Sequence, residues 1–244
     1  MNTRRAEELA AALKEITDRI ERACQRVGRS SDEVRLIAVT KTFPAADAAA
    51  LLDLGVRNLG ENRDQEAAAK VREVEELRPD TDVRWHMVGR LQRNKARPVA
   101  RWAAEVQSVD SLRLADALTK AVRAALDAGE RDRPLDVLVQ ASLDDDPSRG
   151  GCPVDDLSEL ADAIAQRSDY LHLRGVMAVA PLGADPEPAF ERLASAAERL
   201  RRDHPEATEI SAGMSGDLDQ AIAYGSTCVR VGTALLGGRG LASP

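Results

Sequence analysis

The chain has 244 residues, with 34 Lys and Arg against 41 Asp and Glu, so its formal net charge is −7. This acidic balance argues against a nucleic-acid-binding protein that is held mainly by phosphate contacts. A content of 43% hydrophobic and 31% charged residues argues against wholesale disorder. Because aromatic residues make up only 2%, the core must be built from aliphatic side chains and Ala.

The three cysteines, Cys24, Cys152 and Cys228, lie far apart and form no Cys-x-x-Cys pattern. They therefore indicate neither a disulfide framework nor a zinc site, and we expect no bound metal. Unpatterned thiols are typical of a reducing compartment, so we expect a cytoplasmic protein. No run of residues approaches the about 20 apolar residues of a membrane span, so no membrane association is expected.

The first 28 residues predict an amphipathic helix. Apolar residues recur at steps of three and four from Leu9 to Val27, and Gly28 ends the pattern. Glu7 and Glu8 interrupt the place where the apolar region of a signal peptide would begin. We therefore expect residues 1–28 to form a helix that packs on the body of a single domain spanning residues 1–244.

Short apolar runs then alternate with helical stretches to the end of the chain. The expected strands are residues 34–39, 56–60, 83–88, 105–109, 135–143, 171–179, 209–212 and 228–231. The expected helices are residues 45–54, 64–77, 94–102, 111–126, 154–166, 186–201, 218–224 and a short one from residue 233.

This order predicts an α/β fold, a (β/α)8 TIM barrel with an extra N-terminal helix. Eight strand–helix units imply parallel strands with helical crossovers, and about 250 residues is the usual size of such a barrel. A doubly wound open sheet shares the alternation. However, no Gly-x-Gly-x-x-Gly follows the first strand, as a dinucleotide site would require.

Functional groups of such barrels lie at the carboxyl ends of the strands. Lys41 follows the first strand directly, and a buried amine at this place would tend toward neutrality and nucleophilicity. A neutral amine can form a Schiff base with an aldehyde. Position alone also fits a lysine whose amine reaches solvent at the rim of the barrel.

The second and third strands bring weaker candidates. Glu61 or Asn62 could face the mouth of the barrel, although Asn62 could equally cap the following helix. His86 could act as a general acid or base, although a lone His within a strand is more often a hydrogen-bonded structural group.

The last two strands are each followed by a small-residue loop that enters a helix. The loops contain Met214, Ser215 and Gly216, and Gly232 and Thr233. Backbone N–H groups that converge in such loops suit a phosphate, and these two loops often build phosphate sites in barrels. Each loop alone also fits ordinary turn and cap chemistry. Together with Lys41, they predict a pocket for a phosphorylated aldehyde.

Basic residues concentrate between residues 89 and 97. This segment could touch a phosphate or RNA. No aromatic residue is interleaved for base stacking and the chain is acidic overall, which favours a solvated loop and helix start.

At these residues the chain resembles the YggS/PROSC family of pyridoxal phosphate homeostasis proteins. The matching stretches occur in the same order through most of the chain. They are Ala38-Val39-Thr40-Lys41-Thr42, Leu59-Gly60-Glu61-Asn62, Trp85-His86-Met87-Val88-Gly89, Leu91-Gln92, Asn94-Lys95, Leu173-Arg174-Gly175-Val176-Met177, Gly213-Met214-Ser215 and Val229-Arg230-Val231-Gly232-Thr233-Ala234.

The resemblance implies a barrel like the N-terminal domain of alanine racemase that holds pyridoxal 5′-phosphate (PLP). It places the Schiff base on Lys41, the arginine facing the pyridine nitrogen at Arg230 and a pocket residue near the ring at Asn62. The phosphate positions fall on Ser215, Gly232 and Thr233, and His86 and Met214 complete the expected cofactor-binding set.

The resemblance also implies a role in PLP homeostasis, by buffering or delivery, without catalytic activity and therefore without catalytic residues. We then expect PLP-dependent apoenzymes to be the partners that receive PLP. We also expect the chain to be a monomer. An arginine at the pyridine nitrogen disfavours its protonation and weakens the ring as an electron sink. We also expect no second domain of the kind with which a racemase completes its active site, because the eight strand–helix units and the leading helix account for nearly all of the 244 residues.

Four residues depart from the family pattern. Phe43 and Arg149 stand where the family often has Lys, and Arg90 and Arg93 replace Pro and Ser. Any role of those lysines in PLP transfer is in question here.

Two alternative functions would also depend on the amine of Lys41. One is a PLP-dependent enzyme that acts on amino acids in the manner of a racemase. The other is an aldolase that forms a Schiff base without a cofactor.

Overall fold

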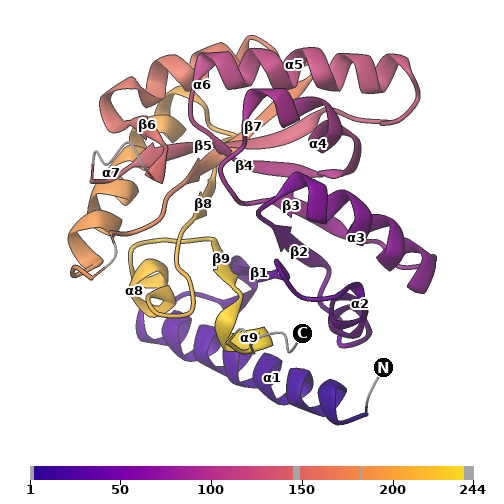
Figure 1. Cartoon of the computed structure of the whole chain (residues 1–244). Helices are drawn as coiled ribbons and strands as arrows, with labels where there is room; N and C mark the ends of the chain where they lie inside the picture. The colour runs from indigo at the N-terminus through magenta and orange to yellow at the C-terminus, as the bar shows by residue number, and fades with distance from the viewer. Residues whose placement is uncertain (1–2, 145–148, 182, 239–244) are drawn as a thin grey trace.

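The computed structural model describes residues 3–144, 149–181 and 183–238. Eight parallel strands close into a barrel in the order β1-β2-β3-β4-β5-β7-β8-β9, with β9 pairing back to β1 and β4 pairing with β5. Helices lie around the outside of the barrel (Figure 1). The predicted TIM barrel is therefore confirmed.

The strands follow the predicted runs closely. The strands of the barrel are β1 Arg35–Val39, β2 Asn58–Glu61, β3 Arg84–Met87, β4 Glu105–Val109, β5 Leu135–Ser142, β7 Leu171–Met177, β8 Glu209–Ser211 and β9 Cys228–Val231. A two-residue strand that was not predicted, β6 Cys152–Pro153, pairs with the end of β5. Strand β7, expected at residues 171–179, ends at Met177.

The helices also match the periodic segments. They are α1 Thr3–Arg26, α2 Ala45–Asp53, α3 Asp64–Leu77, α4 Ala96–Trp102, α5 Leu112–Asp127, α6 Leu157–Ala165, α7 Glu187–Asp203, α8 Leu218–Ala223 and α9 Thr233–Leu236. Ser111 lies outside α5 because its side chain caps the helix by accepting from the N–H of Leu114. Among the described residues, no helix is long and apolar enough to cross a membrane.

Helix α1 packs along one side of the barrel against α2, α8 and α9 (Figure 1). Its buried stripe includes Leu9, Ile16 and Ile20. Arg19 and Arg26 on the same helix both pair with Asp219 of α8, so charged contacts reinforce the apolar ones. The extra helix is thus fixed against the end of the chain.

Aliphatic residues and Ala fill the space between the barrel and its helices, as the low aromatic content predicts. The inside of the barrel is different, because it also holds fully buried polar side chains, among them His86, Glu105 and Gln107. Buried polar groups require hydrogen-bond partners, so these residues form a connected network.

Candidate functional site

A cavity of about 540 Å³ opens at the carboxyl ends of the strands. Loops after β1, β2, β3, β8 and β9 contribute to its lining. Seven of the eight candidate residues line it: Lys41, Asn62, Met214, Ser215, Arg230, Gly232 and Thr233. Its volume falls in the range of small-molecule sites.

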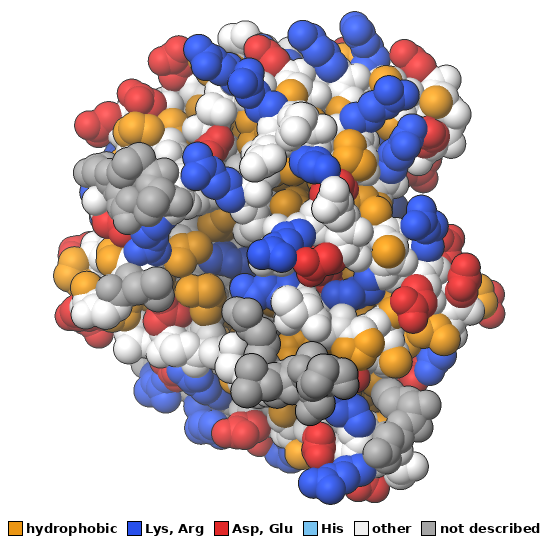
Figure 2. Space-filling view, in the orientation of Figure 1, with side chains coloured by type: hydrophobic (Ala, Val, Ile, Leu, Met, Phe, Trp, Pro, Cys, Tyr) orange, Lys and Arg blue, Asp and Glu red, His pale blue; other side chains and the backbone are white. Residues whose placement is uncertain are grey.

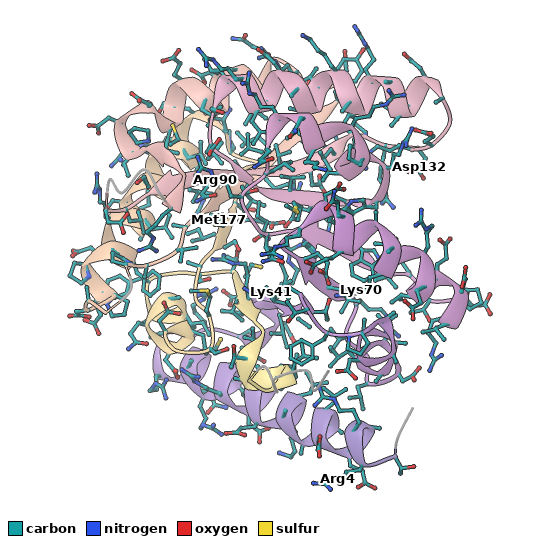
Figure 3. All side chains as sticks on the ribbon, in the orientation of Figure 1. Arg4, Lys41, Lys70, Arg90, Asp132 and Met177 are labelled. Carbon is teal, nitrogen blue, oxygen red and sulfur yellow. The ribbon has the colours of Figure 1, made fainter. Side chains whose placement is uncertain are left out.

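Lys41 lies in the turn after β1, and Figure 3 places it near the middle of the molecule. Its side chain is exposed, which fits the alternative of a lysine at the rim of the barrel and not that of a buried amine. The reason is geometric: strand pairing ends before Lys41, and the turn leaves its side chain at the open face of the cavity. The amine is therefore accessible to a molecule that enters from solvent.

A buried ion pair supports the residue that precedes Lys41. The Nζ atom of Lys70 in α3 donates to Glu61 Oε1 at 2.6 Å and to the carbonyl of Thr40 at 2.7 Å. The Thr40 hydroxyl also donates to Glu61 Oε1 at 2.6 Å. Glu61 therefore points toward α3 and not into the mouth of the barrel, where the sequence had placed it as one alternative.

The backbone beside Lys41 is unusual. Thr42 has φ of 67°, a left-handed conformation that is unfavourable for a β-branched residue. Such a conformation is kept when contacts with the surrounding structure hold the residue in place. The anchored Thr40 on one side and Phe43, which lines the cavity under the guanidinium of Arg5, fix this turn from both ends.

The two small-residue loops meet at the cavity. The Ser215 hydroxyl accepts from the N–H of Ala234 at 3.2 Å, which joins the loop after β8 to the start of α9. The Asp217 carboxylate accepts from the N–H of Met214 at 2.6 Å. From outside, Arg19 of α1 donates to the carbonyl of Ser215 at 2.6 Å. The loops are thereby fixed independently of any ligand.

Arg230 on β9 forms part of the lining although its side chain is almost completely buried. Its guanidinium donates to Ser211 Oγ at 2.6 Å and to the carbonyl of Ala178 at 2.9 Å. Burial lowers the pKa of this guanidinium from its very high ordinary value. An arginine remains charged under such a change, so Arg230 supplies a fixed positive charge to the cavity.

Asn62 comes directly after β2, and its Oδ1 atom is buried without a hydrogen-bond partner among the described residues. Gly89 packs so tightly on it that a Cβ atom at Gly89 would lie 2.4 Å from the Asn62 carbonyl oxygen. A buried polar atom without a partner is costly, which points to a ligand that pairs with it.

The structure does not bring His86 to this cavity. Its ring is fully buried inside the barrel, with Nδ1 3.0 Å from Glu105 Oε1 and Nε2 3.0 Å from Asn58 Oδ1. Both ring nitrogens are thus engaged within the protein. The sequence left two roles open for His86, a general acid or base and a hydrogen-bonded structural group. Its position inside the barrel fits the structural role.

Of the four residues that depart from the family pattern, one lines the cavity. Phe43 lines the cavity, whereas Arg90 and Arg93 line a neighbouring hollow of about 880 Å³ at the start of α5. Figure 2 shows Lys and Arg side chains gathered at the middle of this face, where Figure 3 labels Lys41 and Arg90. Arg149 donates to the carbonyls of Val179 and Ala180 and so holds the loop after β7.

Sequence reasoning missed three groups of residues that shape the site. Val39, Val88 and Val179 form apolar walls of the cavity, Thr42 lines it, and Lys70 and Arg19 support its loops from outside. The only sequence signal for Lys70 was its spacing with Ala67 and Val74 on the buried face of α3.

Comparisons with known proteins agree with this geometry. Residues 12–240 match the family described as alanine racemase, N-terminal domain. A pyridoxal phosphate homeostasis protein of Mycobacterium tuberculosis is 50% identical over 98% of this chain and 96% of its own length. A protein of the same name from Escherichia coli is 39% identical over 95% of this chain and 97% of its own length.

The chain belongs to the family of pyridoxal phosphate homeostasis proteins. A solved member of similar structure is PipY of Synechococcus elongatus with PLP bound. It is 34% identical, has a TM-score of 0.79 and aligns with 94% of this chain and 100% of its own length. The family assignment thus confirms the resemblance on which the sequence analysis relied.

Proposed function

We propose that the chain binds PLP in the cavity, covalently through Lys41, and takes part in PLP homeostasis. The observation that carries the proposal is the lining itself. Among the described residues that line the cavity, Lys41 and Arg230 are cations and no residue is acidic. This charge favours a ligand that carries a phosphate.

The chemistry of the lining fits each part of PLP. The bound cofactor supplies an aldehyde, which condenses with a primary amine and releases water. Lys41 offers that amine, and the loops of Ser215 and Thr233 offer hydroxyls and backbone N–H groups for the phosphate. The side chains of Val39, Val88 and Val179 offer apolar surface for the planar ring, and the unpaired Asn62 Oδ1 offers an acceptor.

We further infer a binding role without turnover of amino acids. No His, Tyr, Cys, Asp or Glu occurs among the described residues that line the cavity, so only Lys41 could exchange a proton there under ordinary conditions. Racemisation needs a base on each face of the substrate. An arginine facing the pyridine nitrogen would also weaken the ring as an electron sink.

The decisive experiment combines absorbance with chemical trapping. Purified protein incubated with PLP is expected to gain a visible absorption band that borohydride abolishes, with the reduced adduct mapped to Lys41. The Lys41→Ala variant should lose the band. Lys120→Ala, on the exposed side of α5, should keep it. A protein that takes up no PLP, or an adduct on another lysine, would refute the proposal.

The same material separates the two other functions. Steady conversion of any amino acid above the rate of Lys41→Ala would indicate a PLP enzyme. Trapping of a substrate carbonyl on Lys41 without PLP would indicate an aldolase. A binding protein shows neither.

We also propose that PLP-dependent apoenzymes receive the cofactor and that the chain works as a cytoplasmic monomer. The exposed Lys41 is accessible for transfer. Among the described residues, the large apolar side chains that are exposed are Val27, Leu54, Leu77 and Leu112, and each belongs to or directly follows a different helix. Apolar side chains exposed singly need no partner surface. Activation of an apoenzyme by the loaded protein, and its mass in solution, test these points.

A further inference from the structure

A chain of buried hydrogen bonds runs through the barrel from the cavity to Glu105 on β4. Arg230 Nη1 donates to Ser211 Oγ at 2.6 Å, and the Ser211 hydroxyl donates to Gln107 Oε1 at 2.8 Å. Gln107 Nε2 then donates to Glu105 Oε1 at 2.7 Å. Ser211, Gln107 and Glu105 are all fully buried or nearly so.

The direction of every bond in this chain is determined. A guanidinium only donates, so Ser211 must accept from Arg230 and give its single proton to Gln107. A carboxylate only accepts, so the NH₂ group of the Gln107 amide must face Glu105 and its oxygen must face Ser211. The Gln107 amide therefore has one allowed orientation, and every donor in the chain points away from the cavity.

Glu105 anchors the far end of the chain as an anion. Burial by itself would raise the pKa of this carboxyl, but the hydrogen bond from His86 and the charge of Arg35 outweigh it and hold the pKa well below its usual range. Arg35 and Arg84 both lie within 3.2 Å of the carboxylate. The chain thus links a fixed negative charge to the positive charge of Arg230.

We propose that Ser211 and Gln107 are positioning residues that hold the guanidinium of Arg230 against bound PLP. The inference rests on the proposed function and goes beyond it. It states that Ser211 and Gln107, which do not line the cavity, control how Arg230 contacts the ring of the cofactor. Arginine side chains have large rotational freedom. Among the described residues, Ser211 Oγ holds Nη1 of Arg230 and the carbonyl of Ala178 holds Nη2. Without Ser211 the guanidinium retains one anchor and can tilt.

The geometry of the strands explains why these residues act together. Glu105 and Gln107 are two residues apart on β4, so both side chains point into the barrel. Arg230 is two residues beyond Cys228, which pairs with Ser211 of β8 in the register of the sheet. Strand β4 and the consecutive strands β8 and β9 thereby contribute one connected chain.

The test compares variants that break the chain with one that removes an equally buried hydroxyl elsewhere. Ser211→Ala and Gln107→Leu remove links between Arg230 and Glu105. Ser226→Ala is the control, because Ser226 is also fully buried, but among the described residues its hydroxyl bonds to backbone groups. Gln107→Asn is a gentler break that adds no apolar volume.

Ser211→Ala and both Gln107 variants are expected to be labelled on Lys41 after borohydride, but with a shifted absorption band and about tenfold faster release of PLP. Ser211→Thr, which keeps the hydroxyl, should restore both properties. Ser226→Ala should lower thermal stability and leave the spectrum of bound PLP unchanged.

Equal spectra and equal release rates in Ser211→Ala, Gln107→Asn and Ser226→Ala would overturn this inference while leaving PLP binding intact. Wild-type protein that takes up no PLP would overturn the proposed function itself. The two failures are therefore distinguishable.

Discussion

The Nζ atom of Lys70 lies 2.6 Å from Glu61 Oε1, and both side chains are buried. The pair contacts Thr40, the residue that precedes Lys41. The pair links α3 to the end of β1 through the carbonyl of Thr40. Glu61 Oε2 has no partner among the described residues, so Lys70 supplies most of what compensates this buried charge.

Replacement of Lys70 by Met should therefore lower the free energy of unfolding by about 3–5 kcal/mol, because it leaves the carboxylate of Glu61 buried and uncompensated. Urea unfolding measures the loss. Lys120→Met, at an exposed position of α5, should change the free energy by less than about 0.5 kcal/mol. The double variant Glu61→Leu and Lys70→Met should regain stability; a double variant weaker than Lys70→Met alone would contradict the buried-charge explanation.

Removal of a hydroxyl from the phosphate loops should weaken PLP retention more than folding. Ser215→Ala and Thr233→Val each delete one hydroxyl at the cavity, where charge-assisted hydrogen bonds to a phosphate are worth about 1.5–3 kcal/mol. Equilibrium dialysis of PLP and thermal unfolding of the apo-protein give the two quantities. Thr119→Val, in α5, is the control. Equal losses of affinity and apo-protein stability would show that the hydroxyls are structural caps.

The N-terminal helix is expected to influence the loop of Ser215 through Arg19. Arg19 and Arg26 both bind Asp219, but only Arg19 also donates to the carbonyl of Ser215. Arg19→Ala should therefore reduce PLP affinity several-fold, whereas Arg26→Ala should not. Titration of both variants with PLP checks this, and identical affinities would show that the contact with Ser215 is dispensable.

The close packing of Gly89 on Asn62 predicts that a single added methyl group disturbs the site. Gly89→Ala places a Cβ atom 2.4 Å from the Asn62 carbonyl oxygen, so the backbone must shift at a cost of about 1–3 kcal/mol. Unfolding and PLP titration should both show the change. Gly216→Ala, whose Cβ would meet nothing within 4 Å, should leave the free energy of unfolding unaltered. A Gly89→Ala protein of wild-type stability would contradict the packing.

The buried His86 predicts a loss of stability in mild acid. Burial lowers the pKa of His86 below 6.5, which outweighs the raising effect of Glu105, and the charges of Arg35 and Arg84 act in the same direction as burial. Because the pKa of His86 is lower in the folded than in the unfolded protein, the folded protein favours the neutral imidazole. This contribution to the free energy of unfolding is fully present above pH 6.5 and is lost as the pH falls through the folded-state pKa.

The free energy of unfolding should then fall between about pH 7.5 and about pH 5.5, with a limiting slope of about 1.4 kcal/mol per pH unit from this group. His86→Asn should show a smaller fall over the same interval. Urea titrations at the two pH values measure the difference. Parallel pH dependence in both proteins would exclude His86 as the source.

Local patterns determined much of the fold. Apolar runs that alternate with helical periodicity predicted the strand–helix units. Side chains on one face recur every 2 residues in a strand and every 3.6 residues in a helix, and these periods do not depend on which element packs against that face. Since the carboxyl ends of parallel strands meet at one end of a barrel, the same patterns placed Lys41, Ser215, Arg230 and Thr233 together. The two-residue strand β6 has no such periodicity, and it was missed.

The pattern of residues along the chain was sufficient to predict the barrel, the lysine at the end of its first strand and the two small-residue loops at the same end of the barrel. It did not predict which side chains are exposed and which are paired: in the folded chain Lys41 is exposed to solvent, Lys70 is buried against Glu61, and His86 points inward to Glu105. Burial and pairing depend on contacts between strands and helices far apart in the chain, and no local spacing encodes them.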